Sequence, residues 1–327
     1  MMKTVTAIAV MAVLSGCVSA QIRSATNVSD SEHNYRFITA LSDSLDLWPC
    51  FSPDGKTVLF SRSSDQGSTW DLYVVRAEGG AAHEFAPVPL LVSGTRPNWS
   101  PATNVIAFTG ESADGLAALW LINADGTMPR RVESPGLSGT VYYPSWYANG
   151  KQLVVVDFGE GDGGVLKLVN IQSGIAAPLT KRLQVLAGMP RVAPDGSTIA
   201  FAGQPNRGQP YDQLKNTIWV LDHSGRRRAL DTGQGRAPAW SPDGNWIAFD
   251  SDRGSANHEY AAFIIHRRGG PARRVTPYQL NANHPVWSPD GKRLAISAQF
   301  SNADRKCTPT GCPRGTAIVE VPHLPPP

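Results

Sequence analysis

Cysteine, net charge and long hydrophobic runs are all scarce in this chain of 327 residues. The formal net charge is only +3 at pH 7, which is too small for a typical nucleic-acid-binding surface. Outside the first 17 residues no segment is apolar enough to cross a bilayer. No stretch has helical periodicity of useful length. These absences exclude a nucleic-acid binder, a protein with several membrane-spanning helices and a helical fold.

Familiar catalytic motifs are also missing. The chain has no Gly-x-Ser-x-Gly nucleophile elbow and no expected hydrolase domain after it. His258-Glu259 begins like the helix of a zinc protease, but the second histidine of that motif is absent. The glycines of the segment 159–164 match a dinucleotide pattern by accident, because the segment joins two expected strands and no helix follows to receive a phosphate. We therefore expect no cofactor and no catalytic set.

A calcium contact is left open on the same segment. Asp157, Glu160 and Asp162 place three carboxylates at the expected rim of the fold. Their spacing differs from that of an EF-hand loop, which supplies its ligands at alternate positions. We therefore assign no metal site there.

The chain is rich in one repeated motif. A proline is followed two residues later by an aromatic or apolar residue, and then by a tight turn of the Ser-Pro-Asp-Gly type. The steps between successive leading prolines are 46 to 48 residues, and these prolines are Pro49, Pro97, Pro144, Pro190, Pro238 and Pro285. A constant period in this range indicates an array of identical supersecondary units. The repeat therefore decides the architecture.

Each unit contains four expected strands. The turn leads into a β-rich run such as Trp246-Ile-Ala-Phe-Asp, and a second run such as Ala262-Phe-Ile-Ile-His follows a polar stretch. A short glycine turn and a more polar strand close the unit. Short β-branched runs between turn clusters are typical of strands. Four antiparallel strands repeated six times predict an all-β, six-bladed β-propeller, with the aromatic residue of each inner strand between neighbouring blades.

The repeats resemble the PD40-type, WD40-like propeller repeat of the TolB family. The resemblance covers residues 35–321, and four of the six units keep the Pro-Asp-Gly turn intact. Asn149-Gly150 replaces it in the third unit, and Ala102-Thr-Asn departs from it in the second. The resemblance implies a single propeller domain. It does not imply the N-terminal α/β domain of TolB, and propellers host binders and enzymes alike.

The last unit lacks an outer strand, and the segment 35–41 has the pattern of one. We expect this segment to pair with the last blade and so to close the ring. Residues 322–327 then form a proline-rich tail.

The N-terminus has the pattern of a lipoprotein signal. Lys3 precedes a short apolar core, and Leu14-Ser-Gly-Cys17 fits a lipobox, which predicts a signal peptide over residues 1–17 and lipidation of Cys17. The polar residues 18–34 are expected to be a tether. Val18 resembles the residue that follows the cysteine in outer-membrane lipoproteins. We therefore expect a monomeric periplasmic domain that contacts the membrane through its lipid anchor only, at the inner leaflet of the outer membrane.

The remaining cysteines agree with an oxidising compartment. Cys307 and Cys312 flank a short loop that contains proline and glycine, and we expect them to form a disulfide. Cys50 occupies a variable position of an inner strand in another unit, where we expect a buried free thiol.

Long connections are expected on one face of the propeller, where function is usually found. The residues just before the repeat prolines are expected to point into the channel mouth on that face. From these and the positions that follow the prolines, the candidate ligand- or partner-binding residues are Trp48, Arg96, Asn98, Tyr143, Arg191 and His284. Such a mouth suits an anionic peptide end or a sugar acid, and the alternative is that these residues only fill the channel and bind water.

Two functions remain open. The first is a non-enzymatic scaffold that binds an envelope protein or peptide. The alternative is a metal-assisted lyase or hydrolase on acidic oligosaccharides, because some related propellers cleave pectin fragments with several channel histidines that hold a metal. Here only His284 occupies a recurrent inner position. A structural subunit of an envelope complex is a third, minor alternative.

Overall fold

The computed structural model describes residues 29–30, 33–39, 44–86, 91–112, 115–138, 140–159, 164–179, 185–205, 212–299 and 312–322. Within these ranges the chain forms 25 β-strands and two short 3-10 helices, Gln213–Lys215 and Tyr278–Leu280. None of the described helices is long and apolar enough to span a bilayer. The predicted signal peptide, most of the predicted tether and the tail after Pro322 lie outside the described residues.

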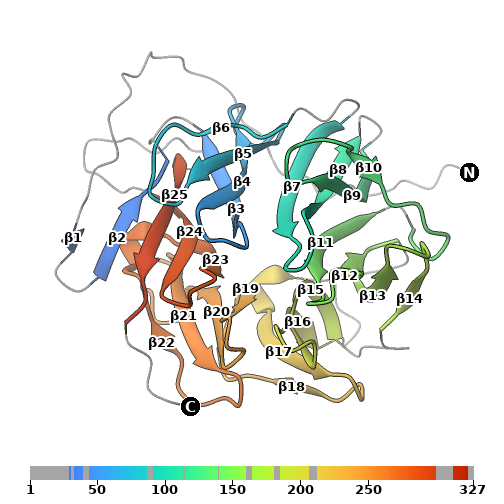
Figure 1. The fold of residues 1–327 in the computed structure, drawn as a ribbon. Helices are drawn as coiled ribbons and strands as arrows, with labels where there is room; N and C mark the ends of the chain where they lie inside the picture. Colours follow the sequence, from blue (N-terminus) through green and yellow to red (C-terminus); the bar gives the residue numbers. More distant parts are fainter. Residues whose placement is uncertain are drawn as a thin grey trace, which may run out of the picture.

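The strands form six four-stranded antiparallel blades around a common centre (Figure 1). Four blades are separate sheets, and the other two belong to one nine-stranded sheet. That sheet divides into two blades because only one parallel bridge, between Arg314 and Leu45, joins them. The all-β, six-bladed propeller predicted from the repeat is confirmed.

Each blade begins at the centre and ends at the periphery. The first blade contains β3 (Leu45–Phe51), β4 (Thr57–Ser63), β5 (Asp71–Arg76) and β6 (His83–Glu84). The second contains β7 (Leu91–Trp99), β8 (Val105–Ser112), β9 (Ala117–Asn123) and β10 (Arg130–Arg131). The third contains β11 (Val141–Trp146), β12 (Gln152–Asp157), β13 (Val165–Asn170) and β14 (Ala176–Pro178).

The second half of the ring repeats this order. The fourth blade contains β15 (Val185–Val192), β16 (Thr198–Pro205), β17 (Thr217–Asp222) and β18 (Arg227–Ala229). The fifth contains β19 (Arg236–Trp240), β20 (Trp246–Ser251), β21 (Ala261–His266) and β22 (Arg273–Arg274). The sixth contains β23 (Asn283–Trp287), β24 (Arg293–Gln299), β25 (Arg314–Glu320) and β2 (His33–Phe37), and β1 (Ser29–Asp30) pairs with β2.

An N-terminal strand completes the last blade, as predicted. β2 pairs antiparallel with β25, with Tyr35 opposite Val319. The backbone amide of Ile38 continues the pairing by donating to the carbonyl oxygen of Thr316 at 2.9 Å. The strand begins two residues earlier than the predicted range 35–41, whose last two residues lie outside the described part of the chain. β1 and the start of β2 therefore extend the sheet into the segment predicted to be a tether.

The core lies between the blades. The second strand of each blade is buried on both sides, and its phenylalanine is fully buried in four blades: Phe60, Phe108, Phe201 and Phe249. The inner-strand tryptophans connect neighbouring blades, as expected. Trp146 Nε1 donates to the backbone oxygen of Asn98 at 3.0 Å, and Trp240 Nε1 donates to that of Arg191 at 2.9 Å. These bonds satisfy the polar end of a large buried side chain.

The repeated turn is held by its own side chains. In the last unit Ser288 Oγ donates to the carboxylate of Asp290, and the Lys292 amide donates to the same carboxylate at 3.1 Å. The hydrogen bond from Ser288 lowers the pKa of Asp290. Gly291 has a φ of 70°, which a residue with a side chain rarely adopts. Local chemistry therefore fixes the end of the inner strand.

Candidate binding site in the central channel

A β-bulge interrupts every inner strand at the same place in the repeat. Between Leu47 and Cys50, two residues of β3 lie opposite one residue of β4. The equivalent register shifts in the other five blades lie between Thr95/Asn98, Tyr142/Ser145, Gly188/Arg191, Arg236/Ala239 and Asn283/Val286. Each bulge contains a repeat proline, which has no N–H for the ladder. The bulge is therefore the structural reason for the proline period.

The residue before each proline has a left-handed backbone. Values of φ between 46° and 58° occur at Trp48, Arg96, Tyr143, Met189, Ala237 and His284. This conformation costs a residue with a side chain roughly 1–2 kcal/mol. A strained conformation in all six blades shows that the surrounding sheets fix it. Its effect is to turn one side chain per blade away from the regular alternation of the strand.

These side chains meet near the centre of the ring. The Arg96 guanidinium lies over the Trp48 ring at 4.3 Å and over the Tyr143 ring at 4.6 Å. The Trp48 and His284 rings are 5.5 Å apart. Met189 belongs to a hydrophobic cluster against which Tyr143 and Ala237 pack. The pre-proline residues therefore lie close together, as predicted. Their binding role stays a prediction.

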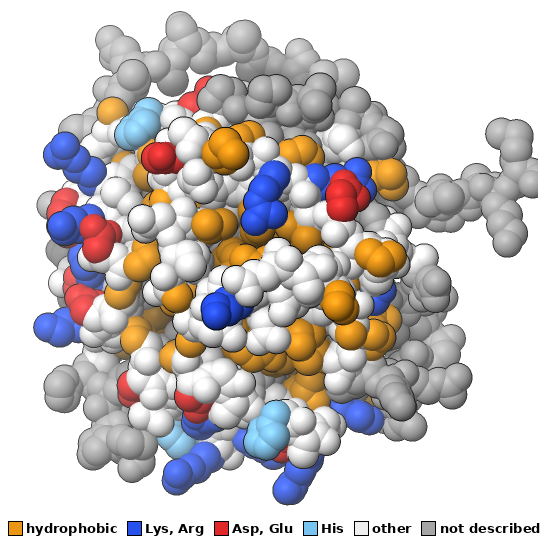
Figure 2. Space-filling model, turned by 45° about the vertical axis from the view of Figure 1, so that its right-hand side comes forward, with side chains coloured by type: hydrophobic (Ala, Val, Ile, Leu, Met, Phe, Trp, Pro, Cys, Tyr) orange, Lys and Arg blue, Asp and Glu red, His pale blue; other side chains and the backbone are white. Residues whose placement is uncertain are grey.

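Water reaches this central group. Trp48, Arg96, Tyr143 and His284 keep part of their surface accessible although they lie on innermost strands. Trp48 also contacts Trp70, at 5.0 Å between rings, and Trp70 stands on the connection between β4 and β5. The group therefore extends toward the face that carries the long connections. In the view of Figure 2, basic side chains stand among hydrophobic ones near the middle of the molecule.

His284 is the histidine of this group, and its surroundings favour the neutral form of its imidazole. Burial, with further contributions from Arg236, Arg314 and Arg96, lowers its pKa to about 3, and Asp250 opposes this shift. Its backbone amide donates to Asp250 Oδ2 at 3.0 Å. Its Nδ1 atom is buried and has no hydrogen-bond partner among the described residues. One ring nitrogen of His284 therefore has no pairing partner among the described residues.

A polar cluster lies beside His284. Arg236 Nε donates to Asp250 Oδ1 at 3.1 Å, and its Nη2 donates to Asn283 Oδ1 at 2.7 Å. The same guanidinium lies 3.8 Å from the centre of the Tyr260 ring. Arg314 donates from Nη1 to a backbone oxygen at 2.9 Å, and burial lowers its pKa to about 10. One carboxylate is thus close to two arginines.

Arg191 follows the bulge of the fourth blade. Its Nη1 donates to the backbone oxygen of Pro190 at 3.0 Å, and its charge interacts with Cys50 and Tyr143. Burial lowers its pKa. Among the described residues no carboxylate lies within ion-pair distance of it. The structure therefore places Arg191 near Tyr143 without a counter-ion.

Asn98 and Cys50 have structural partners. The Trp146 amide donates to Asn98 Oδ1 at 3.1 Å, and the Trp99 amide donates to Cys50 Sγ at 3.4 Å. Both contacts connect one blade to the next. The Asn98 carbonyl is therefore occupied in this structure. Cys50 is buried and free, as predicted, and burial raises the pKa of its thiol.

Sequence reasoning missed Arg236, Asp250 and Arg314. A comparison of the six units could have found Asp250, because the same position of the second strand holds Ser61, Thr109, Val156, Ala202 and Ser297 in the other blades. An acid at a position that is otherwise small or apolar indicates a local partner. Arg236 stands two residues before its repeat proline, but no signal in the repeat marks Arg314.

The other candidates from the sequence gain no support as sites. Asp157 bonds to Lys167 Nζ at 2.6 Å, while Glu160 and Asp162 lie outside the described residues. His258 is exposed and pairs with Asp252 at 3.0 Å. Cys312 is described, but Cys307 and Cys17 are not, so the disulfide and the lipidation stay predictions.

The donor atoms in the channel decide whether it could hold a metal ion. No group of three or more histidine, cysteine, aspartate or glutamate side chains comes together in the described part of the chain. His284 has the two oxygens of Asp250 near it, but these already accept hydrogen bonds from Arg236 and from the His284 backbone. The described residues therefore do not fit a channel metal.

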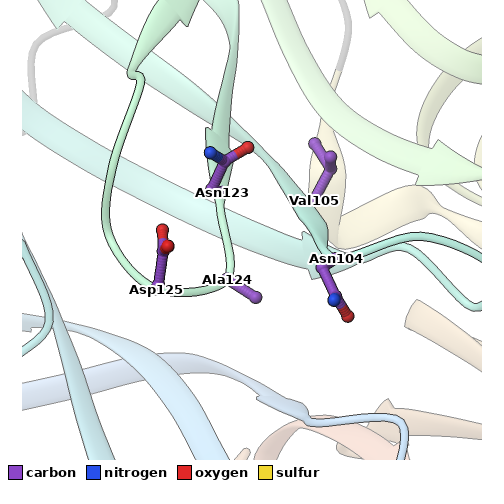
Figure 3. Close-up of a pocket in the computed structure, with 5 residues that line it drawn as sticks. All are labelled: Asn104, Val105, Asn123, Ala124 and Asp125. Atoms are coloured by element: carbon purple, nitrogen blue, oxygen red, sulfur yellow. The ribbon is translucent and has the colours of Figure 1, made fainter.

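An open depression lies away from the channel. It is lined by Asn104 and Val105 at the start of β8 and by Asn123, Ala124 and Asp125 in the turn after β9 (Figure 3). These turns belong to the face with the short connections. The depression contains one carboxylate and two amides, and Asn123 and Asp125 already bond to Thr127 within their turn. The depression therefore has few polar groups left to bind a ligand.

Comparison with known proteins agrees with this architecture. The TolB β-propeller domain family matches over residues 23–228 and 138–308. The chain belongs to this family. A putative TolB from Agrobacterium tumefaciens superposes with a TM-score of 0.62 at 19% identity, covering 87% of this chain and 94% of that one. At this identity the likeness shows the fold alone.

Two other similar proteins carry enzyme names. An oligogalacturonate lyase, solved in complex with manganese, superposes with a TM-score of 0.56 at 15% identity and covers 94% of this chain and 99% of that one. The uncharacterized peptidase YuxL of Bacillus subtilis is 33% identical over 168 residues, which are 50% of this chain. The match covers only 23% of the length of YuxL. The domain match shows the family, while the names of these similar proteins point to different activities.

Proposed function

We propose that this TolB-family propeller is a non-enzymatic scaffold of the cell envelope that binds a protein or peptide at the long-loop end of its channel. The observation that carries the proposal is the convergence of the left-handed pre-proline residues. Trp48, Arg96 and Tyr143 form one stacked aromatic–cation group that water reaches. Aromatic and arginine side chains are the types that contribute most to protein interfaces.

The cost of the arrangement supports a binding role. The six left-handed residues reduce the stability of the free protein. Arg96 Nε and His284 Nδ1, two buried atoms that no described residue pairs with, reduce it further. A channel that only needed filling would be more stable with apolar side chains and regular strands. Strain and unpaired groups that a partner can satisfy are typical of binding sites.

The lyase alternative has less support. Its resemblance is one of fold, and a metal-assisted reaction needs several ligands around one ion. In the described residues no group of three or more histidine, cysteine, aspartate or glutamate side chains is placed to hold a metal ion. The scaffold is therefore the better hypothesis for the site as it stands.

Affinity capture from detergent-solubilised membranes tests the proposal. The wild type is compared with a triple variant, Arg96→Ala with Tyr143→Ala and His284→Ala, and bound proteins are quantified by mass spectrometry. We expect partners of the wild type to fall at least about tenfold with the variant, since loss of central anchors costs more than about 1.4 kcal/mol.

A matched control carries the same number of changes on exposed side chains: Arg130→Ala, Arg131→Ala and Lys151→Ala. Circular dichroism and thermal unfolding verify that each variant is folded. Equal recovery of the same proteins by all three forms would show that the channel is not the binding site.

A further inference from the structure

Arginine side chains gather at the outer edge of the fourth and fifth blades. The segments 222–231 and 266–274 contain seven arginines and two carboxylates. Each segment includes the short turn before an outer strand and that strand itself, β18 or β22. Five of the arginines are exposed and have no carboxylate within ion-pair distance among the described residues. They form the basic edge: Arg226, Arg228, Arg268, Arg273 and Arg274.

Contacts between the two blades bring these charges together. Arg228 Nη2 donates to the backbone oxygen of Arg267 at 2.7 Å, and its Nη1 donates to that of Arg268 at 3.3 Å. Arg274 lies over the Tyr278 ring at 4.5 Å. The arginines of the fourth blade therefore lie directly beside those of the fifth. Like charges held so close together repel one another, and a bound anion relieves the repulsion.

The carboxylates near the basic edge do not neutralise it. Asp195 pairs with Arg267 at 3.2 Å, so it serves an arginine outside the exposed set. Asp222 accepts hydrogen bonds within its own turn, from Ser224 Oγ at 2.6 Å and from backbone amides. With the neighbouring turns included, seven arginines still exceed four carboxylates: Asp195, Asp222, Asp231 and Asp243.

Protection of an exposed edge strand does not account for this charge. Charged side chains on an edge strand do prevent it from pairing with another sheet. The outer strand of the third blade, Ala176–Pro178, contains no charged residue, and that of the first blade is His83–Glu84. In the second blade, Arg131 pairs with Glu133 at 3.3 Å. Other blades therefore protect their outer strands without such an excess of arginine.

The basic edge lies beside the point where the N-terminal chain enters the propeller. β2 is the outer strand of the sixth blade, next in the ring to the blade that contains β22 (Figure 1). β2 runs antiparallel to β25, so it begins beside the end of β25, where Glu320 is opposite Arg293. Arg293 directly follows a Pro-Asp-Gly turn. The chain therefore enters on the face with the short connections, which also carries the turns of the basic edge.

The predicted lipid anchor keeps a membrane within reach of this face. Cys17 stands 12 residues before Ser29, the first described residue. Twelve residues extend over at most about 43 Å. A bilayer that contains acidic phospholipids attracts basic side chains near its surface, and each one strengthens binding roughly fivefold. The charge of the edge and its position together favour a lipid surface as its partner.

We propose that the basic edge contacts an anionic phospholipid surface and turns the long-connection face, with its channel, away from the membrane. The inference goes beyond the proposed function, and it rests on the predicted lipidation of Cys17 for the choice of partner. The contact is weak without the anchor and sensitive to salt. It therefore sets the orientation of the propeller, while the anchor retains the protein on the membrane.

Vesicle flotation tests the contact without the anchor. The full chain with Cys17→Ser is mixed at low ionic strength with vesicles of phosphatidylcholine, or with vesicles in which about a quarter of the lipid is phosphatidylglycerol. We expect at least about tenfold stronger binding to the anionic vesicles, because several arginines lie near the lipid. The difference should vanish at about 1 M salt, where the Debye length falls to about 3 Å.

Two matched triple variants locate the contact. Arg226→Gln with Arg268→Gln and Arg273→Gln removes three charges from the basic edge and keeps the backbone oxygens that Arg228 binds. The control removes three charges from exposed residues of the first three blades: Arg76→Gln, Arg130→Gln and Lys151→Gln. We expect the preference for anionic vesicles to be lost in the first variant and to change by less than about twofold in the control. Thermal unfolding verifies that both variants are folded.

Equal binding to neutral and anionic vesicles, or equal losses in the two variants, would overturn the inference. Soluble poly-glutamate is the second probe. If the protein binds it and does not bind the anionic vesicles, the edge belongs to an acidic protein partner and the lipid assignment is wrong. Neither variant changes a channel residue, so membrane capture that depends on Arg96, Tyr143 and His284 would leave the scaffold proposal standing.

Discussion

At the scale of single residues, the left-handed bulge position decides what each blade contributes to the channel. The same backbone conformation carries an indole at Trp48, a guanidinium at Arg96 and an imidazole at His284. Differences between blades therefore lie in the side chain and not in the direction in which it points. The six positions share one backbone conformation, and the side chain at each determines the chemistry of the channel centre.

The lowered pKa of His284 makes stability depend on pH. The folded-state pKa of about 3 lies below the value of 6.5 for an unperturbed histidine, so the unfolded chain takes up a proton first as the pH falls. The stabilising contribution is complete above pH 6.5 and is lost progressively toward pH 3, at about 1.4 kcal/mol for each pH unit.

This predicts a pH-dependent effect of His284→Gln. Between pH 7 and pH 4.5 the free energy of unfolding of the wild type should fall by about 2–3 kcal/mol more than that of the variant. Urea unfolding at both pH values measures the difference. His223→Gln, on an exposed turn, is the matched control. An identical fall in wild type and His284→Gln would contradict a buried neutral imidazole.

At the scale of elements, the sequence predicted most of the fold. Turn chemistry is local, so Ser288-Pro-Asp-Gly and its counterparts could be found without knowing the rest of the chain. The spacing of these turns predicted the six blades. The lack of an outer strand in the last unit predicted that the segment near Tyr35 closes the ring. The strand was found two residues earlier than predicted, because the ends of strands depend on the partner strand.

The site was predicted less completely for a physical reason. The repeat proline marks the position of each channel residue, but the left-handed φ there is imposed by neighbouring sheets. After each bulge the alternation of the strand is shifted, so Asn98 points to the next blade and not to the channel. Arg236, Asp250 and Arg314 come together from β19, β20 and β25, a contact that forms only when the fifth and sixth blades pack against each other.

The closing strand β2 should contribute more to stability than the other outer strands. Phe37 is 1% exposed and belongs to the same hydrophobic cluster as Trp287 of β23. Phe37→Ala should lower the free energy of unfolding by about 3–5 kcal/mol, the usual effect of emptying a buried phenylalanine site. His83→Ala in the exposed outer strand β6 should change it by less than about 0.5 kcal/mol.

Urea titration of both variants provides the comparison. A loss below about 1 kcal/mol for Phe37→Ala would show that β2 is no more important than an ordinary edge strand. A loss of the expected size with a single cooperative transition would show that closing the ring and folding the blades are one event.

At the scale of the whole molecule, the proposed lipid anchor would hold the propeller, and with it the channel, at a fixed point of the envelope. The predicted lipidation of Cys17 makes this testable by fractionation. Cys17→Ser should move the protein from the membrane pellet to the soluble periplasmic fraction, because it removes the predicted lipid anchor. A membrane-bound Cys17→Ser protein would contradict a lipid anchor, and Cys50→Ser serves as the control.

The pairing of β2 with β25 has a mechanical consequence. The chain enters the propeller through β2, the strand that completes the last blade. A force on the N-terminal side therefore acts first on the pairing of β2 with β25. If the protein is anchored, a force applied by a bound partner acts on the hydrogen bonds around Tyr35 before it reaches the other blades. Under tension the ring would therefore open at the β2–β25 pairing before the other blades unfold.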